Sequence, residues 1–334
     1  MNRRFVNLLV NKLRAPRPAF KLHCIDPATL FYPARSPKAA AADPAATNEP
    51  APASGRLPSP AISFDWPCRP HQTGWMHFMP FKNSVFSVDH EGRMNHPLRH
   101  RLAPRSKTIA FTVSDDLYVM AREPGSPPQS HLFQALHWRP LPQPSFDFPD
   151  DDEDPSSYGP EEAVNPYAVS SCTVYGDSQI WISTVAAGVY SYDTVSGRWS
   201  KGNASALPFR GRAEYVPEHG LWFGFSREGE QLCAADLAVA RPALEKVWED
   251  PAPPEPCSLT ASHLLPLGSG KLCVARLFQK TRRVELCPSV YTNAESFAVL
   301  SGVEILRVGS TGSLQMIKHK SKRYSFGHDE VKLI

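Results

Sequence analysis

Apolar residues along this chain gather in short runs that come in pairs. The few residues between the two runs of a pair are often Gly, Asp, Asn or Ser, as hairpin turns require. The predicted hairpins are Met76–Phe81 with Ser84–Val88, Thr108–Val113 with Leu117–Ala121, Gln179–Thr184 with Gly188–Tyr192, Gly220–Phe225 with Gln231–Ala235, and His263–Leu267 with Lys271–Phe278. Further strands are predicted at Phe5–Val10, Phe297–Leu306 and Ser313–His319. Because prolines interrupt the stretches that could otherwise hold a long helix, the pattern predicts an all-β chain.

Several strands are predicted to end in an acidic residue, at Asp26, Asp89, Asp193 and Asp236. Asp193 and Asp236 lie 43 residues apart, and a four-stranded propeller blade repeats every ~40–50 residues. The longer spacings contain two inserted segments. The repeat therefore predicts one β-propeller domain over residues 1–334 with six four-stranded blades, five or seven being the alternatives. The strand Phe5–Val10 is expected to complete the last blade, so that the N- and C-terminal strands close the ring.

The two inserted segments differ in composition. Residues 34–56 form an Ala/Pro-rich tract with few apolar side chains to bury, and we expect a disordered insertion. Residues 147–162 contain the run Asp150-Asp151-Asp152-Glu153-Asp154, which repels itself and is expected to form a solvated acidic loop. The run lacks the alternating spacing and central glycine of an EF-hand loop, so it does not predict a calcium site.

The segment Tyr192-Asp193-Thr194-Val195-Ser196-Gly197-Arg198-Trp199 resembles a kelch repeat. Kelch repeats have a Tyr-Asp pair, a turn, and a Trp six residues after the Asp, and Leu207-Pro208-Phe209-Arg210 is similar to the start of the next kelch blade. Of the kelch double glycine only Gly224 is present, and the match is degenerate in the other blades. The resemblance implies a kelch-like propeller. We expect the repeated acids to accept N–H groups in turns and the Trp to pack between blades. Arg212 and Glu214 are expected to pair between blades.

Nearly the whole chain is also similar to an uncharacterised plant family that is expanded in grasses. The similarity rests on the start at Met1-Asn2-Arg3-Arg4-Phe5, the stretch Arg210–Glu218 and the tail Ser321–Phe326. That family has no assigned activity, so the resemblance implies a propeller and little else.

Composition and charge narrow the function classes. The net charge is +3, which gives no general reason to expect nucleic acid or an anionic membrane as a partner. No apolar run approaches the ~18 residues of a membrane helix. Seven cysteines without a C-x-x-C pair predict reduced thiols in an intracellular protein, cytoplasmic or nuclear. The basic, acid-free segment Met1–Phe20 leaves a mitochondrial location as the alternative.

No motif of catalysis or cofactor binding occurs in the chain. Phosphate-binding glycine loops, a Gly-x-Ser-x-Gly elbow and a His-Glu-x-x-His pair are all absent from the sequence. Cys68, His71 and His77 could come together, but they lack a fourth zinc ligand and a familiar spacing. We therefore expect no cofactor and no metal, and no enzymatic activity.

The leading hypothesis is a non-enzymatic interaction scaffold, monomeric, whose loops bind an unknown protein partner. Three charged segments are the candidate contact surfaces, and their candidate residues are Arg93, Arg99, Arg101, Arg105, Asp151, Asp152, Lys320, Lys322 and Arg323. The first segment lacks interleaved aromatic residues, so nucleic acid is not expected there. The run Lys318–Arg323 reads as a solvated strand edge, with a nuclear import signal as the alternative. The alternative function is a small-ligand binder or enzyme with a site in the central channel.

Overall fold

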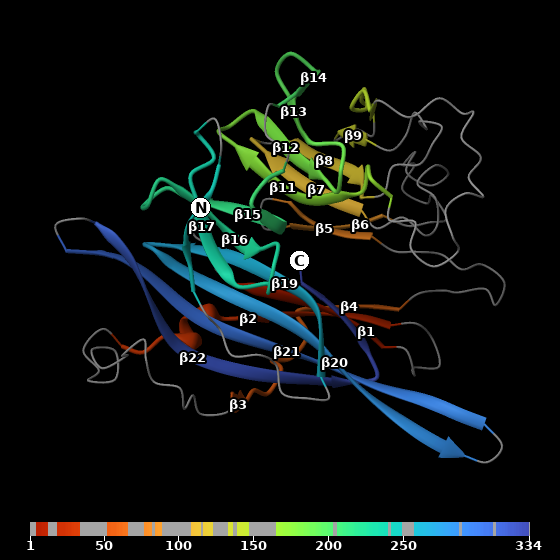
Figure 1. Cartoon of the computed structure of the whole chain (residues 1–334). Coiled ribbons are helices and arrows are strands. Elements are labelled where there is room, and N and C mark those ends of the chain that lie inside the picture. Colours follow the sequence, from red (N-terminus) through yellow and green to blue (C-terminus); the bar gives the residue numbers. More distant parts are fainter. Residues whose placement is uncertain are drawn as a thin grey trace. The chain divides into compact units, whose positions relative to one another are not determined.

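A computed structural model describes fifteen segments of the chain. They are residues 5–12, 19–33, 52–65, 77–81, 84–88, 108–114, 116–122, 133–135, 139–146, 165–202, 206–239, 242–248, 257–286, 289–309 and 312–333. These segments form β-strands and one 3-10 turn, η1 (Pro27–Leu30), and contain no α-helix (Figure 1). The predicted all-β class is confirmed.

The chain divides into two compact units. Unit 1 contains residues 1–72, 216–235 and 244–334, and unit 2 contains residues 73–215 and 236–243. Both the predicted disordered insertion at 34–56, apart from residues 52–56, and the predicted acidic loop at 147–162 lie outside the described residues.

Unit 2 contains two antiparallel meanders that follow each other along the chain. The first has the order β10-β9-β8-β7, and the second has the order β14-β13-β12-β11, followed by β15 in parallel to β11. Their strands are β7 (Thr108–Val113), β8 (Asp116–Ala121), β9 (Phe133–Ala135), β10 (Arg139–Pro140), β11 (Val169–Tyr175), β12 (Gln179–Thr184), β13 (Val189–Asp193), β14 (Arg198–Lys201) and β15 (Phe209–Val216). The hairpin of β5 (His77–Phe81) and β6 (Ser84–Val88) belongs to the same unit.

The two meanders of unit 2 share one hydrophobic core. Phe111 and Tyr118 come from the first meander, and Ile180, Ile182 and Tyr192 come from the second; all are nearly inaccessible to solvent. The rings of Tyr118 and Tyr192 meet edge to face, with 6.3 Å between their centroids. Burying one apolar face of each sheet against the other is what joins the meanders into one unit.

Unit 1 is built from three groups of strands. The first has the order β23-β1-β2-β4, the second β16-β17-β18, and the third β19-β20-β21-β22-β3. Their strands are β1 (Val6–Lys12), β2 (Ala19–Ile25), β3 (Ala53–Ser54), β4 (Ile62–Asp65), β16 (Leu221–Ser226), β17 (Leu232–Ala235), β18 (Leu244–Val247), β19 (Cys257–Gly268), β20 (Lys271–Leu286), β21 (Ser289–Val308), β22 (Ser313–Gly327) and β23 (Glu330–Leu333). Within the third group only the contact of β22 with β3 is parallel.

The five-stranded sheet of unit 1 supplies residues to two cores. One core brings Leu8 of β1 and Leu30 of η1 together with Leu300 of β21, and the other brings Phe223 of β16 together with Leu272 of β20. All five side chains are almost completely buried. The five-stranded sheet is therefore covered on both sides by elements that lie far away in the sequence.

The five predicted hairpins are all present, as the antiparallel pairs β5–β6, β7–β8, β12–β13, β16–β17 and β19–β20. Their arrangement differs from the predicted ring in two respects. None of the described sheets is closed, so the six-bladed propeller is not confirmed. Strands β20 and β21 have 16 and 20 residues, far more than the ~5–6 of an average strand. The prediction ended β20 too early, at Phe278, and began β21 too late, at Phe297, because the polar residues between these two positions interrupt the apolar pattern.

The two ends of the chain meet in one sheet. β1 pairs antiparallel with β23, with Leu8 opposite Leu333, and with β2 on its other side. The terminal strands thus pair with each other, but the partner of the first strand is not the one that the sequence predicted. The segments 297–306 and 313–319 already pair with one another within β21 and β22, so β1 is not needed there.

Candidate functional site

The structure describes one of the three predicted contact segments. Arg93, Arg99, Arg101 and Arg105 lie outside the described residues, as do Asp151 and Asp152. Lys320, Lys322 and Arg323 all lie on β22. The candidate site is therefore the part of β22 around these three residues, which we call the basic strand (residues 318–323).

The basic strand belongs to a sheet near its edge. On one side β22 pairs with β21 along most of its length. On the other side, within the described residues, it pairs with β3 only where Lys322 faces Ala53 and Arg323 faces Ser54. One further bond follows, from Gly55 N to the Arg323 carbonyl oxygen at 2.7 Å. Within the described residues, the outer backbone edge of the basic strand is thus paired only briefly.

A β-bulge interrupts the basic strand. Ser301 faces Ser321 and Val303 faces Lys318, so His319 and Lys320 together stand opposite the single residue Gly302. A bulge turns side chains away from the regular alternation of a strand. Gly302 itself permits a close approach, because a Cβ atom at this position would lie 2.6 Å from the Leu30 carbonyl oxygen of η1. The bulge and the glycine together bring the turn η1 directly onto the basic strand.

His319 joins the basic strand to the residues that follow η1. Its side chain is 4% exposed, and its Nε2 lies 3.1 Å from Glu304 Oε2. The Tyr32 N–H donates to His319 Nδ1 at 3.3 Å. Because Nδ1 accepts this bond, the proton of the neutral ring is on Nε2, where it is donated to Glu304. Both ring nitrogens are thus used to hold the chain, and His319 acts as a positioning residue for Tyr32.

Cations of unit 1 lie over aromatic rings on and beside the basic strand. Lys320 Nζ is 4.9 Å from the centre of the Tyr32 ring, and Arg323 Cζ is 3.8 Å from the centre of the Phe297 ring. On β20, Lys271 Nζ is 5.3 Å from the centre of the Phe31 ring. Each such contact contributes about 0.5–1 kcal/mol at an exposed position. The contacts hold otherwise flexible cationic side chains close to fixed positions.

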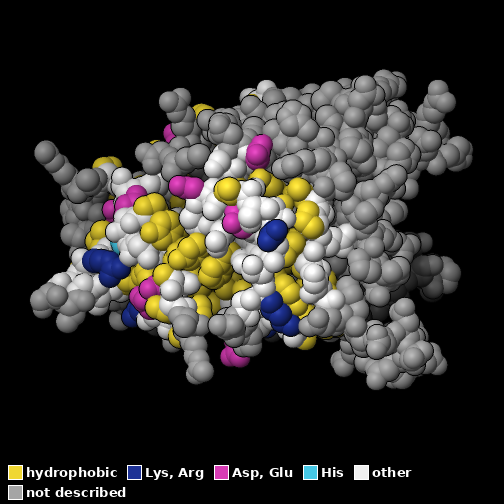
Figure 2. All heavy atoms as spheres, turned by 90° about the horizontal axis from the view of Figure 1, so that it is seen from above, with side chains coloured by type: hydrophobic (Ala, Val, Ile, Leu, Met, Phe, Trp, Pro, Cys, Tyr) yellow, Lys and Arg dark blue, Asp and Glu magenta, His cyan; other side chains and the backbone are white. Residues whose placement is uncertain are grey.

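The face shown in Figure 2 differs from the basic strand in how its charged side chains are distributed. On the described part of that face, hydrophobic side chains gather in the middle, and Lys, Arg, Asp and Glu side chains lie singly among and around them. No large patch of one charge sign appears there. The run of cations along β22 is therefore not repeated on this described surface.

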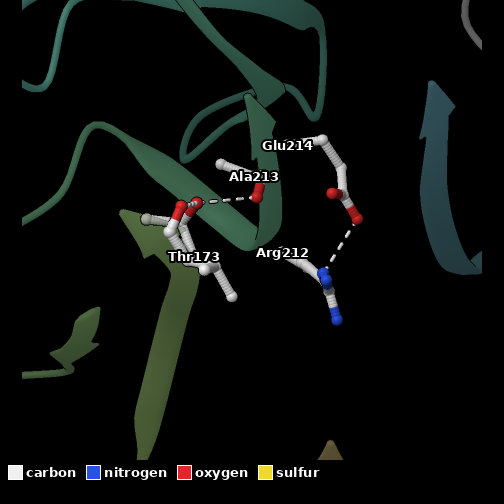
Figure 3. A network of polar contacts seen from close by, with 5 residues as sticks. Thr173, Arg212, Ala213 and Glu214 are labelled. Atoms are coloured by element: carbon white, nitrogen blue, oxygen red, sulfur yellow. Dashed lines mark hydrogen bonds and ion pairs between the residues drawn. The ribbon is translucent and has the colours of Figure 1, made fainter. Parts of the chain in front are cut away.

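A second polar network lies in unit 2, around β15. Arg212 Nε and Glu214 Oε1 are 2.8 Å apart, and the Thr173 hydroxyl donates to the Ala213 carbonyl oxygen at 2.9 Å (Figure 3). The predicted pairing of Arg212 with Glu214 is confirmed, but it runs along one strand rather than between blades. The neighbouring Cys172 is buried, and this burial raises the pKa of its thiol to about 11. The network ties β15 to β11 and supplies no activated nucleophile.

The repeated acids cap turns, as predicted. Asp193 Oδ1 accepts the Val195 N–H at 2.9 Å, Asp26 Oδ1 accepts the Ala28 N–H at 2.9 Å, and Asp236 Oδ1 accepts the Ala238 N–H at 2.8 Å. Asp89 lies outside the described residues. Trp199 connects the two meanders of unit 2, because its Nε1–H donates to the Pro142 carbonyl oxygen at 2.7 Å.

Three of the described cysteines, Cys172, Cys233 and Cys273, are buried and poor nucleophiles. Burial raises the pKa of both Cys233 and Cys273 to about 12, so these thiols stay protonated at neutral pH. Cys68 and His71 of the cluster considered in the sequence lie outside the described residues. Among the residues that are described, no three His, Cys, Asp or Glu side chains come together in a way that could hold a metal ion. The basic strand itself combines cationic side chains, ring contacts and a briefly paired backbone edge.

Sequence reasoning missed the residues that organise the basic strand. Tyr32 and His319 are 287 positions apart, and Glu304 and Gly302 lie on a neighbouring strand in a register that a bulge shifts. No local pattern marks any of them, because their roles arise only from the packing of η1 on the sheet.

Among the described residues, no helix is long and apolar enough to cross a membrane. In the comparisons with known proteins, no curated protein matches the sequence. The family model described as "Protein of unknown function (DUF1668)" matches residues 3–324. Because this match spans nearly the whole chain, the protein belongs to the DUF1668 family.

Proposed function

We propose that this chain is a non-enzymatic protein-interaction module that binds an acidic, extended segment of a partner protein along β22. The observation that carries the proposal is the arrangement of the basic strand. Lys320 and Arg323 are held over the rings of Tyr32 and Phe297, beside a backbone edge that pairs with β3 over only two residues.

Two physical properties of the basic strand favour such a partner. A sheet edge offers N–H and C=O groups to which an extended peptide can add as a further strand, which supplies affinity without regard to sequence. The cations beside that edge then select for acidic side chains and speed the encounter. Because the ring contacts already restrict Lys320 and Arg323, less side-chain entropy is lost when an acid binds them.

A protein partner fits this surface better than a nucleic acid does. Single-stranded nucleic acids bind by stacking bases on exposed aromatic faces. Here the faces of Tyr32 and Phe297 are occupied by the cations above them, and Phe297 is 5% exposed. The surface thus has charge to offer but no free stacking platform.

We also propose that unit 2 consists of kelch-like blades in an intracellular plant protein. Two consecutive four-stranded antiparallel meanders with a common core support this architecture, and so does the Tyr-Asp turn that ends at Trp199. The five described cysteines are all free thiols, which is in keeping with a reducing compartment. A six-bladed ring remains the prediction for the whole chain.

The proposal can be tested by fluorescence anisotropy with the full-length protein and a short labelled peptide that alternates Glu with Val. We expect saturable binding that weakens as salt is raised. The variant Lys320→Glu/Lys322→Glu should weaken binding by about tenfold or more, because it reverses two charges at the site.

A matched control reverses two charges elsewhere in unit 1. Arg227 and Lys246 are exposed, and Arg227→Glu/Lys246→Glu changes the net charge by the same amount as the test variant. It should leave peptide affinity nearly unchanged. Equal weakening by both variants would reduce the interaction to overall charge, and an absence of binding by the unaltered protein would contradict the proposal.

A further inference from the structure

The longest hairpin of unit 1 extends beyond its sheet. β20 and β21 pair with each other from Lys271–Glu304 to Leu286–Ser289. The last residue of β20 that pairs with β19 is Lys280, and the first residue of β21 that pairs with β22 is Ser296. Residues 281–286 and 289–294, which we call the arm, therefore pair only with each other within the described structure. The ribbon can be followed to the lower right in Figure 1.

An arm of this kind has two backbone edges that no described strand covers. A two-stranded ribbon without a third strand is only marginally stable in water, and its unpaired edges are templates for another strand. The edge of β21 is partly engaged at its base, where His328 Nδ1 lies 2.9 Å from the Ala294 carbonyl oxygen. The edge of β20 has no such contact among the described residues, and Thr281 at its base is exposed.

The sequence of the β20 edge is suited to pair with its own copy. In a two-fold antiparallel pair, one residue must face the same residue of the second copy, because hydrogen-bonded and non-bonded positions alternate along the ladder. With Val284 at this centre, Arg283 of each copy comes opposite Glu285 of the other. Centring on Arg282, Arg283 or Glu285 would instead place like charges opposite each other, which destabilises a sheet.

The edge of β21 cannot gain from charge pairing in any register. Residues 289–294 contain no charged side chain, so no register there gains opposite charges. Charge complementarity thus favours one edge and one register. We propose that the protein forms a symmetric homodimer in which the β20 edges of two arms pair antiparallel around Val284, in place of the monomer expected from the sequence. This inference is independent of the proposed role of β22.

The experiment is a measurement of mass in solution by light scattering and sedimentation over a range of concentrations of the full-length protein. We expect a dimer that dissociates on dilution. Glu285→Arg and Arg283→Glu each place like charges at both cross-strand positions, so each should raise the dimer dissociation constant by about tenfold or more. The double variant Arg283→Glu/Glu285→Arg restores opposite charges and should restore the dimer.

The control is Glu245→Arg, the same reversal on the exposed strand β18, which should leave the dimer intact. Circular dichroism and thermal unfolding of every variant separate loss of the dimer from loss of the fold. A protein that is monomeric at every concentration would overturn the inference, as would single variants that remain dimeric. Failure of the double variant to recover would do the same.

Discussion

The meander β11–β14 of unit 2 and the sheet β19–β22 of unit 1 are both antiparallel, yet they are held in different ways. In the meander, β12 and β13 have 6 and 5 residues and are followed by a turn whose cap at Asp193 is local. There Asp193 accepts the Val195 N–H, and the Gly197 N–H returns to the Asp193 carbonyl oxygen. In the sheet, the long strands β20 and β21 depend on η1, whose Leu30 lies against Gly302.

The difference shows which kind of information specifies each region. A turn that is stabilised within a few residues forms whatever lies around it, so the meander can be recognised in the sequence. A sheet that is covered by segments from the other end of the chain depends on contacts that exist only in the complete fold. The four predictions that follow test this contrast, beginning with the largest expected effect.

Truncation of the core should affect both regions equally. Ile182 of the meander and Leu300 of the sheet are both 0% exposed, and Ile182→Ala or Leu300→Ala should each lower the free energy of unfolding by about 2–5 kcal/mol, measured by urea denaturation. The control Val195→Ala removes methyl groups from a side chain that is 84% exposed and should stay within about 0.5 kcal/mol of the unaltered protein. A small effect at only one core position would show that this region tolerates a cavity by collapsing around it.

Close packing against a distant segment should matter most in the sheet. Gly302→Ala places a Cβ atom 2.6 Å from the Leu30 carbonyl oxygen, so either the turn η1 or β21 must move. We expect a loss of about 1–3 kcal/mol in unfolding free energy. Gly202→Ala in unit 2 is the control, because the nearest atom to its added Cβ is 3.5 Å away. Equal effects of both substitutions would remove the proposed contrast.

The contact between the two meanders of unit 2 should be weaker but measurable. Trp199→Phe removes the bond from Nε1 to the Pro142 carbonyl oxygen and should cost about 0.5–1.5 kcal/mol in thermal or urea unfolding. Trp181→Phe is the matched control, since its indole bond goes to the nearby Gln179 side chain. The first variant should be the less stable of the two. The opposite order would mean that the local bond matters more than the one that connects the meanders.

The turn at Asp193 should leave a small signature in the pH dependence of stability. The Val195 N–H bonded to the carboxylate lowers the pKa of Asp193 below its ordinary value of 3.8. The charged carboxylate therefore stabilises the fold above about pH 4, and this contribution is lost as the pH falls through the lower folded-state value. Asp193→Asn keeps an oxygen for the Val195 N–H but cannot titrate. Its unfolding free energy should fall less steeply between about pH 4 and pH 2, whereas parallel curves would contradict the assignment.

Much of the local structure could be predicted because it depends on neighbouring residues. Turn-forming residues between two apolar runs were enough to locate five hairpins, and the acids after strands were enough to locate turn caps at Asp26, Asp193 and Asp236. The basic run Lys318–Arg323 was correctly placed on a strand. Its surroundings were not, because Tyr32 reaches His319 only after the chain has folded back from its first residues.

The extent and order of the strands were decided in the tertiary structure. β20 and β21 continue through polar residues because each supplies the other with backbone partners, and no hydrophobic pattern is needed for that. Likewise β1 pairs with β23 rather than with the segments expected, since β21 and β22 satisfy each other. The sequence alone determined the all-β class, the hairpins and their turns, which rest on alternation and turn chemistry over a few residues. The tertiary structure decided strand partners, the bulge at His319 and the packing at Gly302, because these depend on which distant surfaces are buried together.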